Sequence, residues 1–173
     1  DLNFINYSFK KELLSKNNKP CAIRYPRDLA HEYKNNDKFQ KIIIGKGKVI
    51  KNGKKIVFLN LGTRLKKILE ISELIKKNYK LDCSIIDMRF AKPIDVKLLQ
   101  TLKKNHNIFV TIEENAIGGF SSQVNDFLIN KLNDTPKILN FFMKDEFIDQ
   151  SDIEDQYSKS VSYTHLRAHE TNQ

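Results

Sequence analysis

The sequence predicts an α/β domain with a parallel sheet, and three observations support this fold class. Two apolar bursts typical of strands, Ser84–Ile86 and Ile108–Ile112, flank a helical pattern that opens at Asp95. Strands alternating with helices form βαβ units, in which the strands lie parallel. Each of these apolar runs also ends at charged or glycine residues. This is expected because the loops that follow parallel strands lie at the same edge of the sheet. We therefore expect ligands or partners to meet the protein at that edge.

The first 28 residues predict the end of a separate domain. Apolar residues recur at near-helical spacing within 1–19, and a short strand follows at Cys21–Tyr25. One helix and one strand cannot form a domain alone, so we interpret residues 1–28 as the close of a preceding domain. Residues 29–42 are polar and typical of a linker. Because the chain does not begin with Met, we expect a fragment or a processed product.

The next segment predicts two strands joined by a tight turn. Residues 42–50 form an apolar pattern interrupted by two glycines, and Asn52-Gly53 is the dipeptide most typical of a two-residue hairpin. The following run, Ile56–Leu61, is the most apolar in the chain. A strand of this kind is expected at the centre of a sheet, covered on both faces.

Glycine-containing turns precede two further predicted helices. Thr63 is the expected N-cap of the first, whose inward residues follow helical spacing. The second runs from Gly118 to Leu132, after which a strand at 137–142 and a helix from Ile153 are expected. Either turn offers backbone amides to an anion, but we favour a simple cap at Gly62-Thr63 and close helix-to-strand packing at Gly118-Gly119. The inward residues expected in the first helix are Leu65, Ile68, Leu69, Leu74 and Ile75.

Composition argues against several classes of function. The formal charge of +9 comes from lysines scattered in pairs, with few arginines and no interleaved aromatic residues, so we expect a solvated surface rather than a nucleic-acid interface. No apolar run approaches the roughly 20 residues that cross a bilayer, and no secretory signal is visible. Cys21 and Cys83 are interpreted as buried free thiols. We predict no nucleic-acid or membrane partner.

The last residues, 158–173, differ in composition from the rest of the chain. Two of the four histidines, His165 and His169, lie there, and the lysine bias disappears. Their four-residue spacing would suit a shared metal on a helix, but a terminal tail is a poor scaffold for the remaining ligands. We predict no metal site and interpret this tail as a non-native or disordered addition.

The charged side chains that could take part in catalysis or binding do not form a complete active site. Glu113 and Glu114 are adjacent on a strand, so they point to opposite faces and cannot form a catalytic carboxylate pair. Arg24 and Arg27 flank a Tyr-Pro turn, where a guanidinium could hold a phosphate with two hydrogen bonds. We predict no catalytic and no cofactor-binding residue in the chain.

Five strings of the sequence carry a resemblance to a known family. They are Ala22–Arg27, Ile44–Gly47, Asp87–Asp95, Thr111–Asn115 followed by Gly118-Gly119, and Phe147-Ile148. In order and spacing they resemble the carboxy-terminal part of the 1-deoxy-D-xylulose-5-phosphate synthase family, which belongs to the transketolase superfamily. The resemblance covers residues 1–157 and is specific because all five strings agree.

This resemblance implies that residues 1–28 end a pyrimidine-binding domain and that 43–157 form a transketolase carboxy-terminal domain, with a mixed, mostly parallel sheet between helices on both faces. It implies a homodimeric parent in a bacterial cytosol or a plastid. That parent would condense pyruvate with glyceraldehyde 3-phosphate, with loss of CO₂, using thiamine diphosphate and Mg²⁺. The product feeds isoprenoid, thiamine and pyridoxal synthesis. The fragment alone would be inactive, because the cofactor-binding segments lie upstream.

Residue by residue, the resemblance assigns the phosphate of glyceraldehyde 3-phosphate to Arg27, while Arg24 is expected to be structural. Two departures affect this assignment: Asp28 replaces a usual glycine beside the phosphate site, and Ser121 replaces a glycine of a GGxGS run. Two alternatives stay open. One is another superfamily member, a 2-oxoacid dehydrogenase β subunit or a transketolase, and the other is a basic binding module without enzymatic activity.

Overall fold

The computed structural model describes residue 7 and residues 41–132 and 134–160. The chain divides into two compact units, residues 1–44 and 45–173, and all strands and helices with described bounds lie in the second. The predicted helix in 1–19, apart from its residue 7, and the strand at Cys21–Tyr25 lie outside the described residues. The division near residue 44 falls close to the end of the expected linker.

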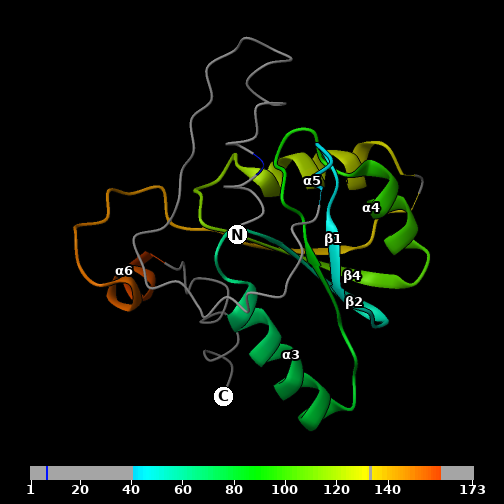
Figure 1. Ribbon diagram of the computed structural model, residues 1–173, viewed down its shortest axis with the longest axis horizontal. Coiled ribbons are helices and arrows are strands. Elements are labelled where there is room, and N and C mark those ends of the chain that lie inside the picture. Colours follow the sequence, from blue (N-terminus) through cyan, green and yellow to red (C-terminus); the bar gives the residue numbers. More distant parts are fainter. Residues whose placement is uncertain (1–6, 8–40, 133, 161–173) are drawn as a thin grey trace, which may run out of the picture. The chain divides into compact units, whose positions relative to one another are not determined.

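A five-stranded mixed sheet forms the centre of the second unit (Figure 1). Its spatial order is β1-β3-β2-β4-β5; β1 runs antiparallel to β3, and all other neighbours are parallel. This confirms the predicted α/β class and the central place of β2. The strands are β1 (Lys48–Lys51), β2 (Lys55–Leu61), β3 (Ser84–Asp87), β4 (His106–Glu113) and β5 (Lys137–Phe141); the helices are α3 (Leu65–Tyr79), α4 (Val96–Lys103), α5 (Phe120–Asn130) and α6 (Ile153–Ser160).

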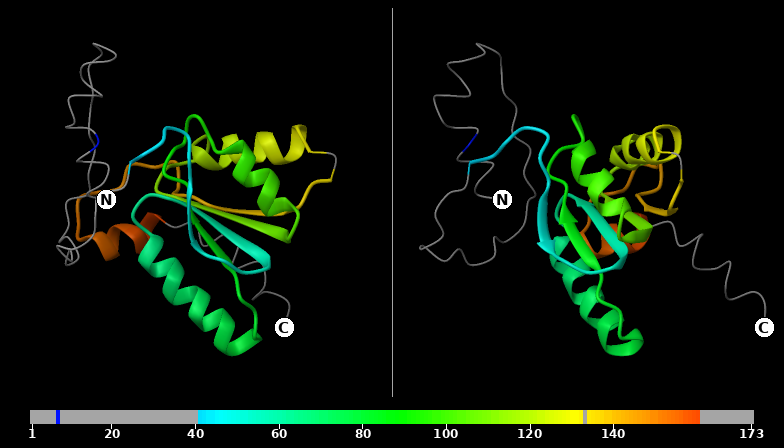
Figure 2. Two further views of the ribbon diagram at one scale, coloured as in Figure 1. Left: turned by 45° about the vertical axis from the view of Figure 1, so that its right-hand side comes forward. Right: turned by 90° about the vertical axis from the view of Figure 1, so that its right-hand side faces the viewer.

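Helices cover both faces of the sheet, as predicted (Figure 2). Successive side chains of a strand point to opposite faces, and β2 shows this clearly. Val57 and Leu59 pack in a cluster with residues of α4 and α5, whereas Phe58 packs in a second cluster with Ile68 of α3. All four side chains are buried. The continuous apolar run of β2 is therefore explained by burial on both sides.

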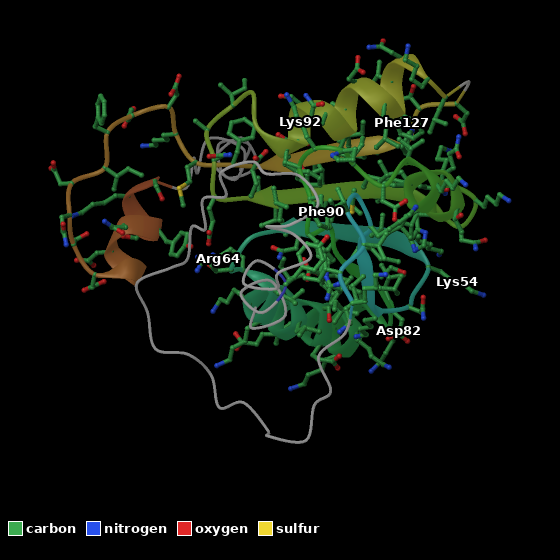
Figure 3. All side chains as sticks on the ribbon, turned by 45° about the horizontal axis from the view of Figure 1, so that its top comes forward. Lys54, Arg64, Asp82, Phe90, Lys92 and Phe127 are labelled. Carbon is green, nitrogen blue, oxygen red and sulfur yellow. The ribbon has the colours of Figure 1, made fainter. Side chains whose placement is uncertain are left out.

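The predicted hairpin between the first two strands is wrong. β1 pairs with β3 rather than with β2, and both edges of β2 are occupied by β3 and β4. The Asn-Gly segment instead lets the chain cross the start of β3: the Lys54 amide donates to the Asp82 carbonyl at 2.9 Å. Figure 3 labels both residues, on the side of the sheet away from α6. The Asn-Gly pattern correctly predicted that the chain turns here. It did not predict that β1 pairs with β3 rather than with β2.

The strand predicted over 42–50 begins only at Lys48. Gly45 has a φ of +73°, and a side chain there would lie 2.8 Å from the Pro93 ring. Gly47 precedes the strand, and its amide donates to Asp95, the confirmed N-cap of α4, whose carboxylate also pairs with Lys46 at 2.9 Å. These contacts hold residues 45–47 against the start of α4.

α3 departs from its prediction in two respects. Arg64, not Thr63, precedes its first turn, and no side chain caps the helix. Leu74 was expected to face the core but is 58% exposed, whereas the buried position is taken by Ser72. The other expected inward residues do pack against the second apolar cluster. Ser72 is tolerated because its hydroxyl donates to the Leu69 carbonyl.

The remaining predicted helices agree well with the structure. Leu99 and Leu102 of α4, and Val124, Phe127 and Leu128 of α5, are buried. The terminal helix α6 runs to Ser160. No helix among the described ranges is both long and apolar enough to span a bilayer.

Candidate functional site

The carboxyl ends of β2, β3 and β4 meet at one edge of the sheet, and polar side chains gather there. Parallel pairing brings Leu61 opposite Glu113 and Asn60 opposite Asp87. The helices that follow β2 and β4 begin at the same edge. In open α/β sheets ligands bind at this edge, so these residues form the candidate site.

Glu113 occupies the amino-terminal end of α5. Its side chain is 5% exposed, and its two oxygens accept hydrogen bonds from the amides of Phe120 and Ser121, each at 2.7 Å. A carboxylate in this position also interacts favourably with the helix dipole. The anion site that a helix amino terminus offers is thus filled by the chain itself.

The Gly118-Gly119 turn allows the Glu113 carboxylate to approach the amino terminus of α5. A Cβ at Gly119 would lie 2.1 Å from the Glu113 Oε2 atom, whereas a Cβ at Gly118 would meet nothing within 4 Å. Gly118 is instead needed for its φ of +98°. The prediction of close helix-to-strand packing is therefore confirmed. Ser121, the departure from the GGxGS run, lies in the first turn of α5 and contributes its backbone amide to Glu113.

Glu114 points to the other face and joins three elements. Its Oε1 atom accepts hydrogen bonds from the hydroxyls of Thr63, just before α3, and Tyr157, in α6. The guanidinium of Arg64 lies 3.2 Å from the centroid of the Tyr157 ring, a cation–π contact. Figure 3 labels Arg64, at the start of α3 on the side toward α6. Glu114 thereby fastens α6 to the start of α3.

Gly62 permits the close approach of Glu114. It has a φ of +115°, and a Cβ there would lie 3.2 Å from Glu114 Oε2. Thr63 was predicted as an N-cap, but its hydroxyl is used by Glu114. The two adjacent glutamates therefore contact helices on opposite faces of the sheet, as expected for the last residue of β4 and the residue that follows it in extended backbone.

Asp87 and Arg89 form a third polar group, after β3. The Asp87 carboxylate accepts a hydrogen bond from the Arg89 amide at 3.3 Å, and its other oxygen lies 3.5 Å from Arg89 Nε. Burial raises the pKa of the Asp87 carboxyl above its ordinary value, while the Arg89 charge opposes the shift. Arg89 has a φ of +60°, which a residue other than glycine adopts only where its surroundings hold it.

Tyr157 makes the attachment of α6 sensitive to alkaline pH. Burial and the hydrogen bond to Glu114 raise the pKa of its hydroxyl above 10. The neutral form is thus favoured in the folded protein, so its stabilising effect is complete below pH 10 and is lost as pH rises through the higher folded pKa. We expect the melting temperature of Tyr157→Phe to fall less than that of the unchanged chain between pH 9 and 11. Parallel curves would contradict this assignment.

Several predicted site residues lie outside the described residues. These are Arg27 with its neighbours Arg24 and Asp28, and both tail histidines. Cys21 is also outside, while Cys83 is buried and free, as predicted. Within residues 41–132 and 134–160, no three His, Cys, Asp or Glu side chains are grouped to hold a metal ion.

The role of Tyr157 had no sequence signal. It lies 43 residues from Glu114, and the contact exists because the chain after β5 folds back to the carboxyl edge. Two backbone bonds fix that return: Met143 donates to the Asn115 carbonyl at 2.9 Å, and Lys144 to the Ser160 carbonyl at 2.9 Å. For Glu114 itself, the sequence predicted the direction of the side chain, opposite to that of Glu113, but not its partners.

Comparisons with known proteins agree with this architecture. The family model described as "Transketolase, C-terminal domain" matches residues 45–160. A 1-deoxy-D-xylulose-5-phosphate synthase of Shewanella denitrificans is 46% identical over 130 residues, which is 75% of this chain and 20% of that protein. One of Psychromonas ingrahamii is 39% identical over 142 residues, which is 82% of this chain and 22% of that protein.

A solved structure is also similar. It is described as a split gene transketolase, inactive beta4 tetramer, with a TM-score of 0.63 and 27% identity, covering 69% of this chain and 39% of that one. The chain thus spans about a fifth of the length of the curated relatives it matches.

Proposed function

Because the chain belongs to the transketolase C-terminal domain family, we propose that it is the carboxy-terminal part of a thiamine-diphosphate-dependent 1-deoxy-D-xylulose-5-phosphate synthase. The parent enzyme would condense pyruvate and glyceraldehyde 3-phosphate with loss of CO₂, as a homodimer that requires Mg²⁺. The observation that carries the proposal is the identity of 38–46% to curated synthases over three quarters or more of this chain. Relatives from bacteria favour a bacterial cytosol over a plastid.

The described residues do not fit the diphosphate or its metal ion. The amino terminus of α5 holds the Glu113 carboxylate, and Glu114 lies against the turn before α3, so an added diphosphate would meet negative charge at both places. We therefore assign no step of the reaction to residues 45–160. Their contribution is to build and orient one edge of the parent enzyme, and the chain alone is expected to be inactive. The similar solved structure is itself described as inactive, which supports that expectation.

A chimera tests the proposed family function directly. Residues 45–160 of this chain would replace the matching part of the Shewanella denitrificans synthase. We expect the chimera to form 1-deoxy-D-xylulose 5-phosphate from pyruvate and glyceraldehyde 3-phosphate, while the 173-residue chain shows no turnover. The matched control is the same graft carrying Gly119→Ala, which should fail to assemble. A chimera that folds and assembles but gives no product would overturn the proposal.

Arg27 is proposed to bind the phosphate of glyceraldehyde 3-phosphate. In the complete parent, Arg27→Ala should raise the apparent KM for the aldehyde phosphate by about tenfold or more, because one charged hydrogen bond is worth about 1.5–3 kcal/mol. The KM for pyruvate should stay nearly unchanged. Steady-state kinetics with each substrate varied in turn provides the measurement, with Arg24→Ala as the matched control. Equal effects on both substrates would remove the assigned role.

A further inference from the structure

Asn52-Gly53 is the one Asn-Gly pair of the sequence, and the proposed function does not use it. At such a pair the glycine nitrogen can attack the asparagine carboxamide, because glycine has no Cβ to obstruct the approach. A bond forms between Gly53 N and Asn52 Cγ, the bond from Cγ to Nδ2 breaks, and ammonia leaves with the Gly53 amide proton. Water then opens the cyclic imide to aspartate or isoaspartate. Asn52 is exposed, so water reaches its carboxamide.

The folded chain holds the Gly53 amide where this cyclisation cannot occur. The amide donates to Ser84 Oγ, and the two heavy atoms lie 2.8 Å apart. In the cyclic imide, Asn52 Cγ takes the place of the amide hydrogen in the plane of the peptide group. A carbon bonded to nitrogen at about 1.3 Å in that direction would lie roughly 1.5 Å from Ser84 Oγ, far inside any non-bonded contact. Cyclisation therefore requires Gly53 N to separate from Ser84.

His106 holds the Ser84 hydroxyl in this position. The Nδ1 atom of His106 lies 2.7 Å from the Leu102 carbonyl oxygen, which can only accept, so Nδ1 carries the hydrogen. In the neutral ring Nε2 is then an acceptor, and the Ser84 hydroxyl donates to it at 2.9 Å rather than to the Gly53 carbonyl at 3.2 Å. Both side chains are buried. The hydrogen bonds thus run in one direction, from Gly53 through Ser84 and His106 to the end of α4.

The segment that precedes Asn52 is the part of the sheet best placed to open. β1 has four residues and lies at one edge of the described sheet, paired with β3. Short segments at an edge open locally without unfolding of the core. An opening that separates Gly53 from Ser84 also lets the Gly53 amide exchange its hydrogen with solvent. Hydrogen exchange at Gly53 and cyclisation at Asn52 therefore need the same open state.

We propose that Asn52 is a deamidation site that Ser84 and His106 keep closed in the folded chain, and that opening of β1 exposes it to conversion. This modification site lies away from the carboxyl edge of the sheet and does not depend on the reaction of the parent enzyme. Failure of the proposal would leave the proposed function untouched.

The isoaspartate product would make such an opening permanent. Its main chain passes through the side chain of residue 52 and is longer by one carbon before residue 53. On one side of this point Lys51 pairs with Ile85 of β3, and on the other the Lys54 amide donates to the Asp82 carbonyl at 2.9 Å. A longer connection cannot keep both contacts in register, so β1 would lose its pairing with β3.

The first test compares two rates in the unchanged 173-residue chain under one set of buffer conditions. Peptide mapping by mass spectrometry follows deamidation of Asn52, and NMR follows hydrogen exchange of the Gly53 amide, each relative to its rate in the unfolded chain. We expect folding to slow both by the same factor, within a few-fold, because both need the same opening. Unequal factors in either direction would overturn the proposal, and so would the absence of any slowing.

Ser84→Ala removes the atom that excludes the imide carbon. We expect Asn52 of the folded chain to deamidate about tenfold faster, as the loss of one buried hydrogen bond implies. His106→Gln should give a smaller increase, because Ser84 stays and loses only its fixed orientation. Val124→Ala in α5 is the matched control, since it destabilises the core away from the crossing and should leave the rate unchanged. Equal rates in Ser84→Ala and Val124→Ala would overturn the proposal; if Ser84→Ala does not fold, the comparison in the unchanged chain decides.

The purified isoaspartate product tests the effect on β1. We expect rapid hydrogen exchange in β1 and along the edge of β3 that β1 covers, while α5 keeps its protection. Asn52→Asp is the matched control, because it adds the same charge without lengthening the main chain, and it should keep β1 paired. An isoaspartate chain that exchanges like Asn52→Asp would overturn the proposed effect on β1.

Discussion

Replacing Glu113 with Ala is expected to lower the free energy of unfolding by about 2–4 kcal/mol, because two buried backbone donors would lose their acceptor together. The amides of Phe120 and Ser121 each donate to this carboxylate at 2.7 Å, and the residue before α5, Gly119, has no side chain to cap the helix. The favourable interaction with the helix dipole would also be lost. Urea unfolding followed by circular dichroism measures the change.

Glu114→Ala is the matched control, because it removes the same group from the next position. Glu114 is only half-buried, and its partners are two hydroxyls that water can reach after the change. We expect faster hydrogen exchange in α6 and a smaller loss of global stability. Glu113→Gln should lie between the two, since one acceptor oxygen remains. If Glu113→Ala and Glu114→Ala destabilise the chain equally, the assigned roles are wrong.

The two glutamates also show which contacts could be predicted from the sequence and which could not. Strand periodicity correctly separated them onto opposite faces, and glycine spacing correctly favoured close packing at Gly118-Gly119. Both inferences depend on neighbours within about eight residues. The partners of Glu114 are Thr63 and Tyr157, which lie 51 and 43 residues away in the sequence, and no local pattern specifies them. Thr63 was therefore interpreted as a cap, the role that its own sequence neighbourhood favours.

The same limit explains the strand order. Periodicity predicted all five strands. The apolar run of β2 also predicted its central place, because a strand buried on both faces is apolar at nearly every position. The pairing of β1 with β3 produces no corresponding sequence pattern. It depends on the chain crossing from β1 past the start of β3 at Gly53, where the sequence favours a hairpin. The resemblance, in contrast, identified a mixed sheet because its motifs span the whole domain.

Replacing Gly53 with Ala is expected to have the largest effect on folding in the described part of the chain. A Cβ at this position would lie 2.3 Å from the Asp82 carbonyl oxygen and 2.4 Å from the Cys83 carbonyl carbon. Both atoms belong to the backbone, so no side chain can rotate away. The Gly53 amide also donates to Ser84 Oγ at 2.8 Å, which fixes the crossing to the first residue of β3.

To relieve this overlap, the crossing would have to separate from the start of β3, and β1 would lose its register with that strand. We expect a loss of about 3 kcal/mol or more in the free energy of unfolding. The matched control, Asn52→Ala, changes the neighbouring residue without adding a group at the crossing. Expression yield, urea unfolding and hydrogen exchange in β1 and β3 would be compared between the two variants. A Gly53→Ala chain as stable as Asn52→Ala would contradict the close approach, and with it the physical reason why β1 pairs with β3 instead of folding back on β2.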